Sequence, residues 1–161
     1  MANIIIDGYN VIGIQHGNIE AERERLVEAL ASYRKRTGHS ITVVFDAWRG
    51  GSERPTRKSS RGVTVVYSSL GETADARIRK MISRDDAQWI VVSSDREVQA
   101  QVWREGSVPI GSEDFLRKLE GGPPAGDFVP LEEDYGPPRR KGSPRRLSKK
   151  EKAVERALKK L

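Results

Sequence analysis

The chain contains no cysteine, so neither disulfide bonds nor thiolate metal ligands are available to it. Its two histidines, His16 and His39, stand apart without a partner at ligand spacing, which argues against a zinc site. No apolar run is long enough for a signal peptide or a membrane span. We therefore expect a soluble, cytoplasmic protein that makes no contact with a membrane.

Several common catalytic motifs are also missing. Gly8 and Gly13 have the spacing of a Walker loop, but Ile14 and Gln15 stand where Lys and Ser or Thr are required. No G-x-G-x-x-G motif follows the first apolar run, and no nucleophile elbow is present. Tyr9 occupies the position at which an Asp-x-Asp phosphatase needs its second acid. These absences exclude the familiar P-loop, dinucleotide-binding, serine hydrolase and phosphatase classes.

Positive charge is concentrated at one end of the 161-residue chain. Residues 1–120 carry a net charge of +1, residues 121–136 carry −4 and residues 137–161 carry +9. A basic cluster of this kind usually contacts phosphate or another acidic surface. The sequence thus predicts a nearly neutral body and a basic tail with an acidic partner.

Composition predicts three segments. Residues 1–120 hold the periodic apolar patterns and are expected to form one domain, and residues 121–146 are rich in Gly and Pro, as in a linker. Residues 147–161 form the basic tail, in which Ser148 and Glu151 have capping-box spacing for a helix. We expect removal of the linker and tail to leave the fold intact and to weaken binding of the acidic partner.

Apolar strands alternate with amphipathic helices. Residues 47–62 are rich in Gly, Ser and Arg and are expected to form a loop. The alternation predicts an α/β fold with a mostly parallel sheet that helices cover on both faces. The expected strands are 4–7, 41–46, 63–68, 89–94 and a short 108–110, and the expected helices are 20–37, 72–85, 95–106 and 112–119.

Acidic residues stand where the expected strands end. Asp7 and Asp46 are the last residues of two strands, and Asp95 lies just beyond a third. Glu72 and Asp75, three residues apart, open the following helix. Because the carboxyl ends of parallel strands meet at one edge of a sheet, these five carboxylates are expected to converge. Their mutual repulsion would be relieved by a hard divalent cation, Mg²⁺ or Mn²⁺.

Each polar residue also has a structural interpretation. Glu72 could complement a helix dipole, Asp95 could cap a helix and Asp46 could begin a turn. Asn10 could form a turn, or it could orient a water or a phosphate. Asp7 is the hardest to explain structurally, because it ends a strand that is otherwise apolar.

Four stretches within residues 1–120 resemble the YacP-like branch of the NYN domains, which are relatives of PIN-domain nucleases. They are IIIDGYNVIG, VVFDAWRGG, GETADARIRKMI and WIVVSSDREVQ, and they occur in the order of that family. The resemblance implies a PIN-like three-layer α/β/α sandwich and metal-dependent cleavage of RNA. The positions that match are Asp7, Asn10, Asp46, Glu72, Asp75, Ser94 and Asp95.

On this resemblance we expect an endoribonuclease of single-stranded RNA that leaves 5′-phosphate and 3′-hydroxyl ends, with mRNA at the ribosome as one context. The expected catalytic residues are Asp7, Asn10, Glu72, Asp75 and Asp95. The expected ligands of Mg²⁺ or Mn²⁺ are Asp7, Asp46, Asp75 and Asp95. The alternative is a non-catalytic module of the same fold that binds RNA or the ribosome, in which the acids are structural.

The expected loop 47–62 carries five cations, which either hold the RNA backbone or are merely solvated. Trp48 within it either packs into the core or stacks on a base. The five cations are Arg49, Arg54, Arg57, Lys58 and Arg61.

Overall fold

In a computed structural model, residues 1–13, 17–47, 52–121 and 147–161 of the chain are described. Six strands form a sheet in the order β3-β4-β2-β1-β5-β6, in which only β3 runs antiparallel to its neighbour. The strands are β1 Asn3–Asp7, β2 Ser40–Phe45, β3 Thr56–Ser60, β4 Val63–Tyr67, β5 Trp89–Val92 and β6 Val108–Ile110. The helices are α1 Gly8–Ile12, α2 Ile19–Thr37, α3 Ala74–Ile82, α4 Arg96–Arg104, α5 Ser112–Leu119 and α6 Lys149–Lys160.

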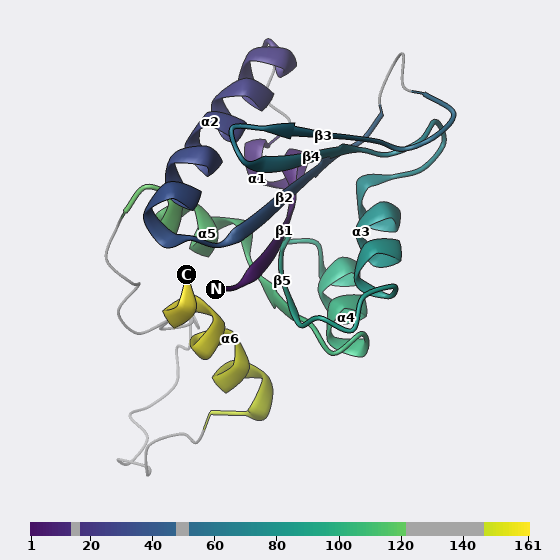
Figure 1. Ribbon diagram of the computed structural model, residues 1–161. Coiled ribbons are helices and arrows are strands. Elements are labelled where there is room, and N and C mark those ends of the chain that lie inside the picture. Colours follow the sequence, from purple (N-terminus) through teal and green to yellow (C-terminus); the bar gives the residue numbers. More distant parts are fainter. Residues whose placement is uncertain (14–16, 48–51, 122–146) are drawn as a thin grey trace, which may run out of the picture.

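Helices cover both faces of this sheet. Helices α1, α2, α5 and α6 pack on one face, and α3 and α4 pack on the other (Figure 1). The predicted three-layer α/β/α architecture with a mostly parallel sheet is confirmed. Within the described ranges, none of the helices has the length and apolar character needed to cross a membrane.

The central strand β1 explains why its sequence is a continuous apolar run. Ile4 and Ile6 face the layer of α2, and Ile5 faces the layer of α3 and α4. All three side chains are fully buried, because a parallel sheet between two helical layers has no solvent face.

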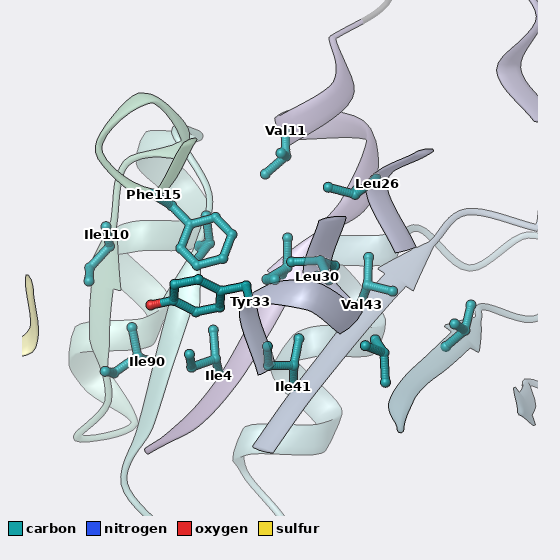
Figure 2. Close-up of a cluster of buried hydrophobic side chains, with 14 of the residues drawn as sticks. Ile4, Val11, Leu26, Leu30, Tyr33, Ile41, Val43, Ile90, Ile110 and Phe115 are labelled. Atoms are coloured by element: carbon teal, nitrogen blue, oxygen red, sulfur yellow. The ribbon is translucent and has the colours of Figure 1, made fainter. Parts of the chain in front are cut away.

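Helix α2 carries the apolar stripe predicted from spacing, with Leu26, Leu30 and Tyr33 buried against the sheet. Figure 2 shows the ring of Tyr33 next to that of Phe115 from α5. The two ring centroids lie 5.8 Å apart in an edge-to-face arrangement, a preferred geometry for aromatic pairs. Helices α2 and α5, far apart in the sequence, therefore share one core.

The prediction of a loop over residues 47–62 is wrong in part, because β3 forms within it. Thr56–Ser60 pairs with β4 in an antiparallel hairpin. The turn consists of Arg61 and Gly62, whose φ angles of 51° and 85° are those that a tight hairpin turn requires. β3 is an exposed edge strand, so backbone pairing forms it and no apolar alternation marks it in the sequence.

The C-terminal helix corrects the prediction that residues 147–161 lie outside the fold. The predicted capping box of Ser148 and Glu151 is present at the start of α6. Ala157 is buried in the same core as α2, and Tyr33 donates a hydrogen bond to the carbonyl oxygen of Leu161 at 2.5 Å. The apolar stripe of α6 is thin, but hydrogen-bond contacts of Leu161 with Tyr33 of α2 and of Lys160 with His39 add to its attachment.

Candidate active site at the carboxyl edge of the sheet

Asp7 lies at the point where β1 turns directly into α1, a short helix that the sequence analysis did not predict. Its Oδ1 accepts a hydrogen bond from the backbone N–H of Asn10 at 3.3 Å, so the carboxylate caps α1. Gly8 makes this turn possible, because a Cβ there would lie 2.2 Å from Cε1 of Phe45. The sequence Asp-Gly-Tyr-Asn thus presents the acid at the edge of the sheet and brings α1 against β2.

Replacing Gly8 with alanine is therefore expected to destabilise the protein by about 1–3 kcal/mol, the usual cost of overpacking a core. The added methyl must displace Phe45 or move α1, and either change shifts Asp7. Chemical denaturation of Gly8→Ala beside Gly17→Ala measures this, because a Cβ at Gly17 would lie within 4 Å of none of the residues that the structure describes. Equal stability of the two variants would contradict the close packing inferred for Gly8.

Asp46, directly after β2, connects that strand to α3. Its Oδ1 accepts a short hydrogen bond from the backbone N–H of Ala74, the first residue of the helix. Asp75 follows Ala74 and is therefore held at the same edge as Asp7. This contact explains how a strand end and a helix start, 28 residues apart, place two carboxylates together.

Asp95 caps α4, as one of its two interpretations predicted. Its Oδ1 accepts hydrogen bonds from the N–H groups of Glu97 at 2.7 Å and Val98 at 3.3 Å. The side chain is exposed at the same edge of the sheet. The cap uses Oδ1, and it fixes the carboxylate in one orientation.

Asn10 holds together two loops that border this edge. Its Oδ1 accepts hydrogen bonds from the backbone N–H of Ser94 at 2.7 Å and from the hydroxyl of Ser112 at 2.5 Å. Ser94 in turn accepts from the N–H of Ser112 at 2.9 Å. Asn10 thus positions the loop before Asp95 through its carbonyl oxygen. The sequence analysis did not anticipate Ser112, because 102 residues separate it from Asn10.

The four aspartates Asp7, Asp46, Asp75 and Asp95, here called the acid cluster, influence one another electrostatically. Burial and, to a smaller extent, the charges of the other three carboxylates raise the pKa of Asp7 to about 6, against the opposing effect of the hydrogen bond from the Asn10 N–H. Burial also raises the pKa of Asp46, as does the charge of Asp75. A buried carboxylate among like charges is a common feature of functional sites.

The prediction that Glu72 converges with these acids is not supported by the structure. Glu72 precedes α3, whose N-cap is Thr73, and its side chain is only 8% exposed. It accepts hydrogen bonds from Lys80 at 2.7 Å and from the hydroxyl of Ser69 at 3.1 Å. Although burial opposes the change, these partners lower the pKa of Glu72. Its carboxylate therefore secures the loop before α3 instead of adding to the repulsion at Asp7.

The donor set of the acid cluster fits a hard divalent cation that shares its ligands with water and substrate. Within the described residues, no three His, Cys, Asp or Glu side chains lie close enough to hold a metal ion by themselves. Mg²⁺ is usually bound through one or two carboxylates together with waters and substrate phosphates, so it does not need such a cage. Asp46 and Asp95 each use Oδ1 in a helix contact, which leaves their Oδ2 atoms as candidate donors.

A cleft of about 250 Å³ between α3 and α4 opens beside the acid cluster. Asp75 lines it together with Arg79 and Arg104. Asp75 forms an ion pair with Arg79 at 3.2 Å, and both side chains are more than a third exposed. The cleft therefore places the positive charge of Arg79 in contact with Asp75, a member of the acid cluster.

The predicted basic loop is divided by the β3–β4 hairpin. Lys58 pairs with Val65 and Arg57 with Val66, and these two valines face opposite layers, so the two cations point to opposite faces of the sheet. Arg61 lies at the hairpin turn, where it forms an ion pair with Glu28 at 2.7 Å. Thr56 at the start of β3 pairs with Tyr67 at the end of β4, so the start of β3 lies at the same edge of the sheet as the acid cluster. The hairpin turn that carries Arg61 therefore lies at the opposite edge. Arg54 precedes β3 near the acidic edge, and Trp48 and Arg49 lie outside the described residues.

A group of rings and cations lies on the α2 side of the same edge. The guanidinium carbon of Arg23 is 5.7 Å from the ring centroid of Tyr9 and 5.9 Å from those of Phe45 and Tyr67. Nζ of Lys58 lies 5.4 Å from the centroid of Tyr67. The sequence analysis missed Arg23, although its spacing from Leu26 and Leu30 places it on the apolar stripe of α2.

The model of the YacP-like NYN domain matches residues 4–159. The uncharacterized protein YacP of Bacillus subtilis (strain 168) is 30% identical over 128 residues, which cover 73% of this chain and 74% of that protein. The crystal structure of Rae1 (YacP) from Bacillus subtilis superposes with a TM-score of 0.62 at 30% identity, covering 75% of each chain. Its W164L mutant gives a TM-score of 0.63 at 28% identity, covering 75% of this chain and 76% of that one. The match of the family model extends through α6, beyond the residues 1–120 that carry the motifs.

Proposed function

Because the chain belongs to the YacP-like NYN domain family of PIN-like nucleases, we propose that it is a metal-dependent endoribonuclease that cleaves single-stranded RNA. The observation that carries this proposal is Asp7, a mostly buried carboxylate at the end of the central strand whose pKa is raised to about 6. Three further acids surround it at the edge of the sheet where α/β proteins place their ligands.

The residues of the acid cluster have distinct roles in this proposal. Asp7, Asp75 and Asp95 are the proposed carboxylates for Mg²⁺ or Mn²⁺, and an ion would take one or two of them together with water and substrate phosphate. Asp46 would serve as an alternative ligand or would orient Asp75 through its contact with α3. Asn10 positions the loop that carries Asp95. A divalent ion bound there supplies Lewis-acid activation of water and phosphate for hydrolysis. Glu72 supports the loop before α3, and it is not required as a ligand.

RNA is the substrate that the surrounding charge favours. Arg57 from β3 and Arg104 from the cleft offer positive charge for the RNA backbone on the side of α3 and α4, and Arg54 adds charge just before β3. Helix α6 exposes further cations, and its contacts with structured RNA would fit an mRNA substrate at the ribosome. The exposed cations of α6 are Lys149, Lys150, Lys152, Arg156, Lys159 and Lys160.

A non-catalytic RNA-binding module is the second candidate, because Asp46 and Asp95 also act as helix contacts in their present positions. In that case metal would be irrelevant to the protein's behaviour toward RNA.

We expect cleavage of a labelled single-stranded RNA in Mg²⁺ or Mn²⁺, and we expect no cleavage in EDTA. The protein should bind the same RNA sequence more weakly in double-stranded form and should cut it more slowly. The measurement is the initial rate on both RNAs at matched ionic strength, because salt alone changes RNA affinity. Binding of RNA without turnover in any divalent metal would favour the non-catalytic candidate.

A further inference from the structure

Three aromatic and two cationic side chains contact one another beside the acid cluster and are here called the aromatic platform. They are Tyr9, Phe45, Tyr67, Arg23 and Lys58. Tyr9 packs edge-on against Phe45 with centroids 5.4 Å apart, and Tyr67 lies tilted against the same ring at 5.8 Å. Phe45 is fully buried and acts as the base of the platform, whereas Tyr9 and Tyr67 are only partly buried.

The platform adjoins the acid cluster by chain connection. Asp46 directly follows Phe45, and Tyr9 lies two residues after Asp7. Tyr67 pairs with Phe45 at the ends of β4 and β2, which are carboxyl ends of parallel strands. A ligand bound at the acid cluster would therefore lie next to the platform.

The two cations of the platform are not engaged in ion pairs among the described residues. In the part of the chain that the structure describes, Arg23 and Lys58 form no ion pair with a carboxylate, although Arg25, Arg61 and Arg79 each form one. Nε of Arg23 is buried and has no hydrogen-bond partner within these residues. Rings hold both cations in place by cation–π contacts, which leave their charge available to an anion.

We propose that the aromatic platform is a subsite for one unpaired nucleotide of single-stranded RNA, next to the phosphate that is cleaved. Its base stacks on Tyr9 or Tyr67, and its phosphate is bound by Arg23 and Lys58. This inference rests on the proposed nuclease function for the position of the phosphate, and it adds the part of the surface that selects unpaired RNA.

The chemistry of the platform favours a nucleotide over a simple anion. Stacking on an aromatic ring is open to every base, but it requires a base that is not paired in a helix. Lys58 is exposed and has a long aliphatic stem, so a base can replace its ammonium over Tyr67, and the ammonium can then reach the adjoining phosphate. A phosphate alone would need the cations but not the two tyrosines.

The test measures binding without cleavage. Fluorescence anisotropy in EDTA compares a labelled oligouridylate with an oligomer of the same length that carries the ribose-phosphate backbone but no bases. Tyr9→Leu and Tyr67→Leu are each expected to raise the Kd for oligouridylate roughly 5- to 100-fold, the usual effect of losing one stacked base. Their Kd values for the base-free oligomer should rise much less than those for oligouridylate, and Tyr9→Phe and Tyr67→Phe, which keep the rings, should recover most of the lost affinity.

Charge is tested separately on α2. Arg23→Gln should weaken binding of both oligomers and reduce the slope of log Kd against log salt by about one. Arg25→Gln is the matched control, because Arg25 lies on the same helix, is 75% exposed and is already paired with Glu22. Thermal melting is recorded for every variant, and Tyr67→Leu decides the test if Tyr9→Leu melts below the assay temperature.

Wild-type affinity of both leucine variants for oligouridylate would overturn the subsite. So would an equal loss of affinity for the base-free oligomer, which would indicate damage to the fold. Because binding is measured in EDTA, base-dependent binding by a protein that does not cleave RNA in Mn²⁺ would refute only the nuclease. Cleavage in Mn²⁺ combined with tyrosine-independent binding would refute only the subsite.

Discussion

Replacing Asp7 with asparagine is expected to reduce RNA cleavage roughly a hundredfold or more while leaving the metal-free protein at least as stable as the wild type. The substitution keeps the shape of the side chain and an oxygen that can accept the hydrogen bond from the Asn10 N–H, but it removes the negative charge that binds a divalent cation. RNA binding should persist, because the cations of the hairpin, the cleft and α6 are untouched. Asp75→Asn and Asp95→Asn should reduce cleavage similarly, and double variants should be far from additive, since the acids act as one unit.

The difference in stability between Asp7→Asn and the wild type is expected to depend on pH in a direction that a structural acid would not show. Burial raises the pKa of Asp7 from 3.8 to about 6, so the folded state binds the proton more tightly than the unfolded state does. Above about pH 6 the ionised carboxylate therefore opposes folding, by up to about 3 kcal/mol for a shift of this size. This penalty decreases as pH falls through 6 and is absent below 3.8.

The measurement is the free energy of unfolding of both proteins in EDTA between pH 4 and pH 8. The advantage of Asp7→Asn over the wild type should be largest at the alkaline end and should disappear toward pH 4. If the variant instead unfolds more easily at every pH and still cleaves RNA at a near-normal rate, Asp7 serves the fold, and the nuclease proposal loses its central residue.

Removing residues 147–161 is expected to lower the stability of the body by several kcal/mol, contrary to the expectation from charge alone. Truncation uncovers the core at Tyr33 and Phe115, and it removes the acceptors of Tyr33 and His39. Ala157→Glu should act in the same direction by on the order of 3 kcal/mol, because it places an unpaired charge at a position that is 4% exposed. For a domain of this size that loss lowers Tm by about 10 °C.

The matched control removes charge from α6 without changing its packing. Lys152 and Arg156 are exposed, so Lys152→Gln with Arg156→Gln should melt as the wild type does. The same double variant should bind RNA more weakly and with a flatter salt dependence, because fewer counterions are released. A truncated protein that melts at the wild-type temperature would show that α6 is only an appended tail.

Much of the fold follows from the sequence because the strands of a sheet between two helical layers are apolar on both faces. The runs at Ile4, Ile41 and Ile90 predicted three strands, which the structure places next to one another, and the apolar stripe of residues 20–37 predicted helix α2. The edge strand β3 could not be predicted in this way, since an exposed strand has no apolar pattern. The place of α6 depends on contacts with Tyr33, 128 residues from its partner Leu161, which no local pattern records.

The positions of the candidate-site residues in the fold were predicted to a similar extent and for similar reasons. Asp7, Asp46 and Asp95 were identified because strand ends and helix starts can be recognised locally, and topology then brings them to one edge. Glu72 was expected to converge with these acids, but its carboxylate binds Lys80, eight residues further along the chain, and Ser69 in the loop before α3. Arg23 was missed, because its aromatic contacts come from three different elements.

The central claim, that the acid cluster is a metal-dependent nuclease centre, is tested most directly by mapping the ends that the purified protein produces from a defined single-stranded RNA. Wild type, Asp7→Asn and Arg25→Gln are incubated with the RNA in Mn²⁺ and in EDTA, and the 5′ and 3′ ends of the products are identified. We predict internal cuts with 5′-phosphate and 3′-hydroxyl ends for wild type and Arg25→Gln in Mn²⁺, and intact RNA in EDTA or with Asp7→Asn. The same cuts in EDTA, or undiminished cuts by Asp7→Asn, would contradict the account.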